Sequence, residues 1–272
     1  MSQGWNLIGN HTDYPSNGSY KLTASFNVKN FTRPIPVFTG DFNGNNETLD
    51  ELPCCLIDKL AGKGIVQNIN FNNVDTRNAE CDPAVANTMH DESIVRFIKI
   101  ENSQFEGVGI DSKIGMVSNF MVSASSLDNV MIVNSTLNGT GVKYAGGVVG
   151  EVDNTGSEFF KVMIVNVNIT GSGKYARVGG VVGYKDARVG GVVGYMAGVK
   201  VKEVYIGNTI VKGGGKDSIV GGVVGFSDKN FIQNVTVIDS NISGKYAGGI
   251  VGYSRSDEVS TCHVIRTEVM VV

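Results

Sequence analysis

A five-residue motif, Gly-Gly-Val-Val-Gly, recurs along the chain and limits the folds open to it. It begins at Gly146, Gly179, Gly190 and Gly221, and returns as Gly-Gly-Ile-Val-Gly from Gly248. Self-similarity of this kind indicates stacked repeats, in which each unit buries its apolar face against the next. A phosphate-binding loop does not fit, because such a loop occurs once, before a helix, with Lys and Ser/Thr after its glycines.

A second element, Val-x-Ile-x-Asn followed by an apolar residue and a glycine, comes before the motif. The column formed by its polar residue comprises Asn102, Asn134, Asn166, Asn208 and Asp239. The steps along this column are 32, 32, 42 and 31 residues. The long step contains an 11-residue tandem duplication within 174–195, and its removal restores 31 residues. We expect one copy to fill the regular coil and the other to bulge outward between Gly183 and Gly194.

The units are rich in β-branched residues, alternate with period two and are bounded by glycine, which favours strands over helices. Recurring columns are best satisfied when equivalent strands stack in register, which an antiparallel sandwich would not explain. We therefore predict an all-β fold, a right-handed parallel β-helix (solenoid) of about seven coils. The handedness follows from the prevalence of right-handed crossovers.

Residues 1–50 differ from the repeats and are predicted to form an N-terminal cap with a lead-in hairpin, ahead of β-helix repeats over 51–272. Alternation from Tyr20 to Val28 is typical of a half-buried strand. Pro34 and Pro36 place the next part at a sheet edge or in a loop.

Three N-terminal segments lack the repeat motif. The segment 38–46 contains Asn-Gly and is predicted to be a turn-rich hairpin. We expect a short helical turn within 51–66, and a loop or short helix projecting from the body at 74–93.

At these motifs the chain resembles the GLUG-repeat family, whose Gly-Gly-Leu-Val-Gly motif recurs in bacterial surface proteins, including β-helical regions of IgA-specific metallopeptidases and other adhesins. The five copies match with Val or Ile where the family favours Leu. The lead-in pattern Phe-x-Gly-x-Phe-Asp-Gly-Asn-Gly-His is matched at 38–47, apart from Asn43, Asn46 and Glu47. The resemblance runs from about residue 20 to the end and implies surface display and binding. Peptidase activity does not carry over, because the sequence has no His-Glu-x-x-His.

Composition bears on partners and compartment. A net charge of -3 argues against nucleic-acid binding, which needs clustered Lys and Arg. No run of about 18 apolar residues occurs, so no membrane span is expected. The start at Met1 lacks the charge and apolar core of a signal peptide. This leaves a mature form or fragment of a secreted or bacterial cell-surface protein, or a cytoplasmic protein.

The outward positions beside the asparagine column are apolar where a solvated strand would be polar. They comprise Met131, Val133, Met163, Val165, Tyr205 and Ile238. Either another segment covers them, or they are a contact surface for a partner or a neighbouring copy. The asparagines themselves are predicted to stack inside a corner as a buried structural ladder.

Tyr144, Tyr175 and Tyr246 each follow a lysine and precede a glycine motif. In a stacked fold they would form an aromatic column able to stack on sugars, which suits a glycan partner. The alternative is that the tyrosines cover adjacent coils while the lysines keep the surface soluble.

The residues give no catalytic centre, and we expect no cofactor and no metal. The acidic residues share no column, unlike the paired carboxylates of a polysaccharide lyase or hydrolase. Cys54, Cys55, Cys81 and His90 have poor spacing for zinc. We expect buried free thiols, with a Cys55–Cys81 bridge in an oxidising compartment as the alternative. Cys262 takes an inward position and is predicted to lie in the core.

We therefore expect a non-catalytic binding or display module of a bacterial surface or secreted protein, not an enzyme, whose partner is a host or neighbouring-cell glycan or protein. The alternative is a carbohydrate-active β-helix enzyme, which acidic residues converging in a groove with a metal would favour. An ice- or crystal-binding rod would need a flat outward Thr or Asn array. The apolar end at Glu268–Val272 predicts either a truncated larger protein or self-association through the C-terminal solenoid edge.

Overall fold

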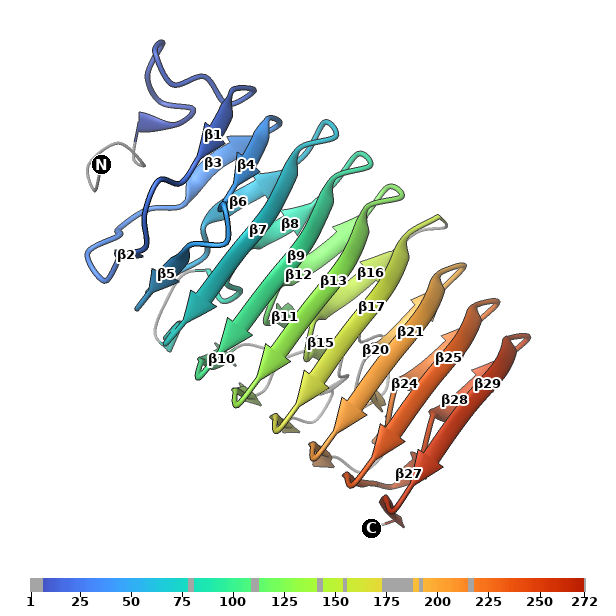
Figure 1. Ribbon diagram of the computed structural model, residues 1–272. Coiled ribbons are helices and arrows are strands. Elements are labelled where there is room, and N and C mark those ends of the chain that lie inside the picture. Colours follow the sequence, from blue (N-terminus) through green and yellow to red (C-terminus); the bar gives the residue numbers. More distant parts are fainter. Residues whose placement is uncertain are drawn as a thin grey trace.

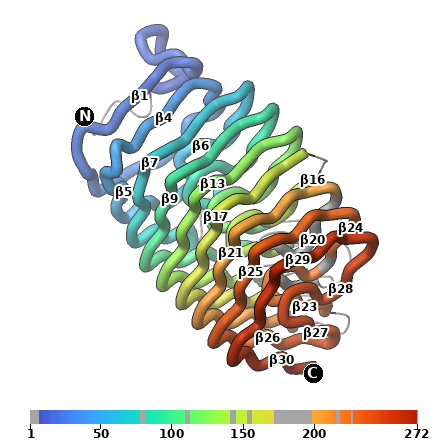
Figure 2. The backbone as a smooth tube through the Cα atoms, turned by 45° about the vertical axis from the view of Figure 1, so that its right-hand side comes forward, coloured from blue at the N-terminus to red at the C-terminus, as the bar shows by residue number. Residues whose placement is uncertain are grey.

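A computed structural model describes residues 7–77, 81–108, 113–140, 144–153, 156–172, 188–190, 193–214 and 218–271. They form a parallel β-helix of about six turns, whose coils stack along one axis between the two termini (Figures 1 and 2). Every pair of strands in this described part is parallel, and it contains no α-helix. The predicted parallel β-helix is confirmed, with about six turns instead of about seven. No helix long and apolar enough to cross a membrane occurs in these ranges.

The largest wall is an 11-stranded sheet, here called the long-strand sheet, which faces the viewer in Figure 1. Its N-terminal strands are β1 (Ser19–Lys21), β2 (Phe26–Asn27), β4 (Asp41–Asn43) and β5 (Thr48–Asp50). Seven eight-residue strands follow: β7 (Ile65–Asn72), β9 (Ile94–Glu101), β13 (Ser126–Val133), β17 (Glu158–Val165), β21 (Lys200–Gly207), β25 (Phe231–Ile238) and β29 (Glu258–Ile265).

Shorter strands build the other walls. A six-stranded sheet contains β10 (Gln104–Val108), β14 (Thr136–Thr140), β18 (Asn168–Ser172), β22 (Ile210–Gly214), β26 (Asn241–Gly244) and β30 (Glu268–Val271). A five-stranded sheet contains β3 (Ile35–Phe38), β6 (Ile57–Leu60), β8 (Ala86–Met89), β12 (Ser118–Val122) and β16 (Val149–Asp153). In the later coils its place is taken by β20 (Val193–Ala197), β24 (Val224–Asp228) and β28 (Val251–Arg255). The remaining strands are β11 (Lys113–Gly115), β15 (Tyr144–Gly146), β19 (Arg188–Gly190), β23 (Ile219–Gly221) and β27 (Tyr246–Gly248).

Each long strand contains one residue that shifts its alternation. In β13, Leu127, Val130 and Ile132 point into the core and are at most 1% exposed. Between them Asn129 adopts a φ of 55° and faces solvent, so that inward positions resume at Val130. Such an extra residue bends the strand as a β-bulge does. Each buried Val, Leu or Ile contributes about 1.5–3 kcal/mol, so the stacked inward columns are the main stabilising term.

The glycine motif forms the tight corner between two short strands. Gly221 ends β23 and Val224 begins β24. A Cβ at Gly221 would lie 1.9 Å from the carbonyl oxygen of Val224, so this close approach requires glycine. Val223 and Val224 are both fully buried, and the motif therefore supplies a turn and two core residues to its coil.

The second copy of the duplicated segment occupies the regular stack. Within it, β19 pairs with β23, and β20 pairs with β24. The five-stranded sheet ends at β16 and a separate sheet begins at β20, so the break in this wall coincides with the duplication. The first copy, and the outward bulge expected for it, lie outside the described residues.

The predicted lead-in hairpin is wrong. The strands on either side of Gly40 do not pair with each other: β3 pairs in parallel with β6, and β4 with β1 and β7. Each strand is therefore matched to a neighbouring coil. As the outermost strand of its sheet, β3 tolerates Pro36, which has no N–H to donate.

The helical turn expected within 51–66 and the projecting segment at 74–93 are also wrong. Both segments contain strands of the same sheet, β6 and β8, which pair in parallel. Leu56 and Val85 are fully buried. Their apolar runs fill the core of the first coils, where the glycine motif is absent.

Candidate functional site

The apolar outward positions form a continuous stripe on the long-strand sheet. Met131, Met163 and Tyr205 are in register on β13, β17 and β21, and Val133 is in register with Val165. The second row continues through Gly207 to Ile238 on β25 and Ile265 on β29. We call these residues the apolar stripe. They point outward because their neighbours in each strand fill the core.

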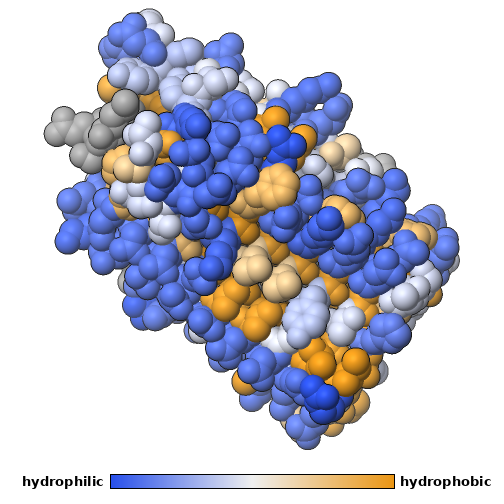
Figure 3. Space-filling view, viewed as in Figure 1, coloured by the Kyte–Doolittle hydropathy of each residue, from blue (hydrophilic) through white to orange (hydrophobic). Residues whose placement is uncertain are grey.

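The apolar stripe faces solvent and carries a groove. Met163 is 37% exposed and Tyr205 is 39% exposed. A groove of about 310 Å³ is lined by Asn129, Val130, Met131, Lys161, Val162, Met163, Glu203 and Tyr205. Figure 3 shows hydrophobic residues gathered over this face between hydrophilic ones. The exposures of Met163 and Tyr205 argue against the reading in which another described segment covers them.

Charged residues border the groove on the side of the bulge. Lys161 and Glu203 occupy the left-handed bulge position, at φ of 53° and 55°, and both side chains are exposed. The Nζ of Lys161 lies 4.8 Å from the ring centroid of Phe160. At the start of the same strands, the Nζ of Lys200 lies 3.3 Å from the Oε1 of Glu158. At each of these two positions, β17 and β21 therefore carry opposite charges.

Tyr144 and Tyr246 do not build the aromatic column expected for sugar stacking. Tyr144 is in register with Lys113, and Tyr246 with Ile219, which pairs in turn with Arg188. Tyr246 is 53% exposed, with the Nζ of Lys245 at 5.8 Å from its ring centroid. Tyr175 lies outside the described residues. Among the described residues the column fails because Arg188 and Ile219 occupy the position that Tyr246 takes in its own coil.

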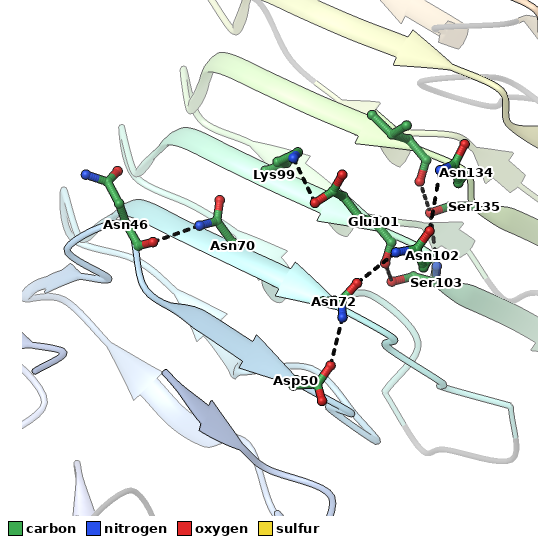
Figure 4. A network of polar contacts seen from close by, with 11 residues as sticks. Asn46, Asp50, Asn70, Asn72, Lys99, Glu101, Asn102, Ser103, Asn134 and Ser135 are labelled. Carbon is green, nitrogen blue, oxygen red and sulfur yellow. Dashed lines mark hydrogen bonds and ion pairs between the residues drawn. The ribbon is translucent and has the colours of Figure 1, made fainter. Parts of the chain in front are cut away.

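The asparagine column forms a ladder of side-chain amides on the surface (Figure 4). Asn102 donates to Asn72 at 3.0 Å, Asn134 to Asn102 at 3.4 Å, and Asn166 to Asn134 at 2.7 Å. Further along, Asp239 accepts two bonds from Arg266 at 2.6 and 2.8 Å, which hold the pKa of its carboxyl below the usual range. Asn208 lies at the same corner position.

The prediction that this column is buried is wrong, because its asparagines are exposed. The five predicted members have φ between 50° and 57°, and this left-handed corner turns their side chains outward. The buried polar residue of the corner is the next one in sequence. Ser135 donates to the carbonyl of Val133 at 2.8 Å and accepts from the N–H of Ser103 at 3.2 Å.

This inner row of Ser103, Ser135, Thr209 and Ser240 was missed from the sequence. Its signal is the recurrence of Ser or Thr directly after the polar column. At the corner, some backbone N–H and C=O groups have no partner in the strand ladders. The buried hydroxyls form hydrogen bonds with these groups. The corner is therefore held by two polar rows, one exposed and one buried.

The cysteines differ from the expectation of free thiols. Cys55 and Cys81 form a disulfide, with 5.6 Å between their Cα atoms, so the alternative weighed in the sequence is the one observed. Burial raises the pKa of the free Cys54 thiol to about 11. Cys262 is in register with the fully buried Val235, yet it is only half-buried because it lies in the last coil.

Titratable groups elsewhere are scattered or paired. Glu151 is buried and paired with Lys113. Burial raises the pKa of Asp82 to about 6, against a hydrogen bond with Asn119 that lowers it.

A second groove of about 390 Å³ is lined by Phe31, Thr32, Pro34, Pro53, Cys54, Asp58 and Cys81. In the described ranges no three His, Cys, Asp or Glu residues lie together as a metal site.

Comparison with known proteins links the fold to solved structures. No protein-family model matches the chain, and no curated protein matches it. A crystal structure from Bacteroides ovatus, provisionally named an immunoglobulin A1 protease, is similar with a TM-score of 0.58 and 16% identity, over 96% of this chain and 81% of that one. A structure named IgA1 Protease is similar with a TM-score of 0.49 and 16% identity, over 95% of this chain and 20% of that one.

At this identity the Bacteroides ovatus structure shows that the fold is shared. Its name contradicts one expectation from the sequence, that this chain is not an enzyme, because the protein with the same fold over nearly the whole chain is named as a protease. We withdraw that expectation.

Proposed function

We propose that this β-helix is the protein-binding part of a secreted or bacterial cell-surface protein of the immunoglobulin A1 protease kind, and that the apolar stripe contacts the protein partner. The observation that carries the proposal is the exposed row of Met131, Met163 and Tyr205 with its groove. Exposed apolar surface bordered by polar residues is typical of protein-interaction sites.

A protein partner suits this surface better than a glycan. Sugar binding relies on aromatic rings with polar groups beside them, whereas Met, Val and Ile dominate the stripe. Methionine side chains are flexible and polarisable, and they adapt to apolar side chains of a partner. The disulfide is typical of oxidising compartments and supports a secreted or surface location.

Binding to immunoglobulin A1, the substrate in the neighbour's name, tests the proposal. The variant Met163→Glu places a charge in the groove, and we expect the dissociation constant to rise about tenfold or more. Thr136→Glu adds the same charge at an exposed position of β14, on another wall, and is the matched control. If the unmodified chain binds and Met163→Glu binds equally well, the stripe is not the contact surface.

Proteolysis is the second candidate function, favoured by the name of the Bacteroides ovatus structure. The same incubations are therefore analysed for immunoglobulin A1 fragments by gel and mass spectrometry. Fragments formed by the unmodified chain and by Met163→Glu alike would separate a catalytic centre from the stripe. Binding without fragments would assign recognition to this chain.

A further inference from the structure

We propose that the partner which fits the apolar stripe is a second copy of this chain, docked face to face about a two-fold axis that lies between β17 and β21 and runs parallel to them. This inference rests on the proposed protein-binding role of the stripe. Such an axis reverses the order of the coils and keeps the position along each strand. Strand β17 of one copy then faces β21 of the other, and β13 faces β25.

The register makes the apolar residues partly self-complementary in this arrangement, with Met131 facing Thr236 and Val165 facing Gly207. Met163 and Tyr205 share one position on β17 and β21, so each faces the other across the interface. Val133 and Ile238 share one position on β13 and β25 and meet in the same way. Both pairs place apolar side chains against apolar side chains, and removal of this surface from water drives the contact.

The charges select this axis over its neighbours. Lys161 and Glu203 occupy the same bulge position on β17 and β21, so Lys161 of each copy faces Glu203 of the other. Glu158 likewise faces Lys200 of the second copy. An axis centred on β17 would place Lys161 against its own equivalent, and one centred on β21 would do the same to Glu203. Like charges brought together in an interface oppose binding, so the axis between the two strands is favoured over these two alternatives.

A third contact follows at the neighbouring outward position. Phe160 of one copy faces Lys202 of the other, because these residues are in register on β17 and β21. Within one chain, Lys161 already lies over the Phe160 ring. The Nζ of Lys202 lies 5.3 Å from the Phe231 ring centroid in its own chain, so the second copy adds an aromatic ring beside a lysine that already contacts one.

The size of the surface predicts a weak dimer. Four coils at about 4.8 Å spacing extend over roughly 15–20 Å, which places the contact at the small end of specific interfaces. We expect a dissociation constant on the order of 100 µM, as for transient contacts.

Complementary charge reversal tests the proposal by sedimentation equilibrium of the full chain. Lys161→Glu makes both bulge residues acidic, and Glu203→Lys makes both basic, so each variant repels its own copy. We expect each to self-associate about tenfold or more weakly than the unmodified chain. An equimolar mixture should form a heterodimer within about threefold of the original affinity, because every bulge residue then faces its opposite. Damage to folding within one chain is not rescued by mixing.

Thr136→Lys, at an exposed position of β14, is the control and should leave the dimer unchanged. An unmodified chain that stays monomeric at about 1 mM, tenfold above the expected constant, overturns the proposal. The proposal is also overturned if the mixture of Lys161→Glu and Glu203→Lys associates no more tightly than either variant alone. Immunoglobulin A1 binding is measured on the same samples. One outcome separates the two proposals. If the unmodified chain is monomeric but binds immunoglobulin A1, and Met163→Glu does not bind it, the self-docking is overturned and the proposed function stands.

Discussion

The side-chain amide of Asn166 donates a hydrogen bond of 2.7 Å to the Oδ1 of Asn134, in the preceding coil. Asn134 in turn donates to Asn102 at 3.4 Å. All three residues are exposed and have a left-handed backbone conformation. One residue type thus performs two tasks at this corner. Asparagine tolerates positive φ better than other non-glycine residues, and its amide is both donor and acceptor.

Substitution of Asn134 separates these two contributions. Asn134→Ala removes both ladder bonds and forces alanine into φ 50°, and we expect the free energy of unfolding to fall by about 2 kcal/mol. Asn134→Gly removes the same bonds without the steric penalty and should cost about 1 kcal/mol less than alanine. Urea unfolding followed by circular dichroism measures the difference. Equal midpoints for the two variants would show that backbone strain plays no part.

The corner glycine is expected to be more sensitive than the ladder. In Gly221→Ala the new Cβ would meet the backbone oxygen of Val224, which cannot move without opening the corner. We expect a loss of about 3 kcal/mol, at the upper end of overpacking effects. Gly18→Ala is the comparison, since the atoms nearest to its Cβ would belong to the side chain of Tyr20, which can shift more easily than backbone. A thermal midpoint for Gly221→Ala as high as that for Gly18→Ala would contradict the steric reading.

The columns of the core could be predicted from the sequence because they depend only on period and register. Val130, Val162, Val204 and Val235 recur at one position and stack as expected. The exposure of Asn134 could not be predicted, because it depends on the left-handed corner, which alternation does not reveal. Strands β6 and β8 were missed because the first coils keep the fold without the motif.

The same limits apply to the candidate site. Most of the apolar stripe follows from alternation within each strand and could be named in advance, whereas Gly207 and Ile265 were not. The Tyr column failed because Lys113, Arg188 and Ile219 occupy the same position, two residues before the corner glycine, in other coils. The disulfide needed the stacked coils themselves, since 26 residues separate Cys55 from Cys81.

Reduction of the disulfide should destabilise the N-terminal coils. Cys55→Ser opens a loop of 26 residues, and chain entropy alone gives a loss of about 3 kcal/mol. Thermal unfolding with and without a reductant checks this, with Cys262→Ser as the control for an unpaired thiol. The unmodified chain should lose stability in reductant and Cys55→Ser should not respond. If reductant lowers the stability of both proteins equally, the effect does not come from the Cys55–Cys81 disulfide.

The partly buried carboxyl of Asp82 predicts a dependence of stability on pH. Its pKa is raised to about 6 in the folded chain from 3.8, chiefly by burial, so the folded state holds the proton more tightly than the unfolded state. The stabilisation from protonation is therefore fully present below about pH 4 and is lost as the pH rises through about 6. Above that, the ionised carboxylate disfavours folding by about 2–3 kcal/mol relative to the protonated form.

Asp82→Asn keeps the size of the side chain and removes the ionisation. We expect the variant to be more stable than the unmodified chain at pH 7, by up to about 2 kcal/mol, and to lose this advantage near pH 4. Urea midpoints at several pH values between these limits measure the difference, and Asp13→Asn, at an exposed site, removes the same charge as a control. A constant difference between Asp82→Asn and the unmodified chain across this range would mean that the carboxyl does not titrate there. Loss of stability at pH 7 would instead mean that the ionised carboxylate is favoured by its contacts, with the hydrogen bond to Asn119 outweighing burial.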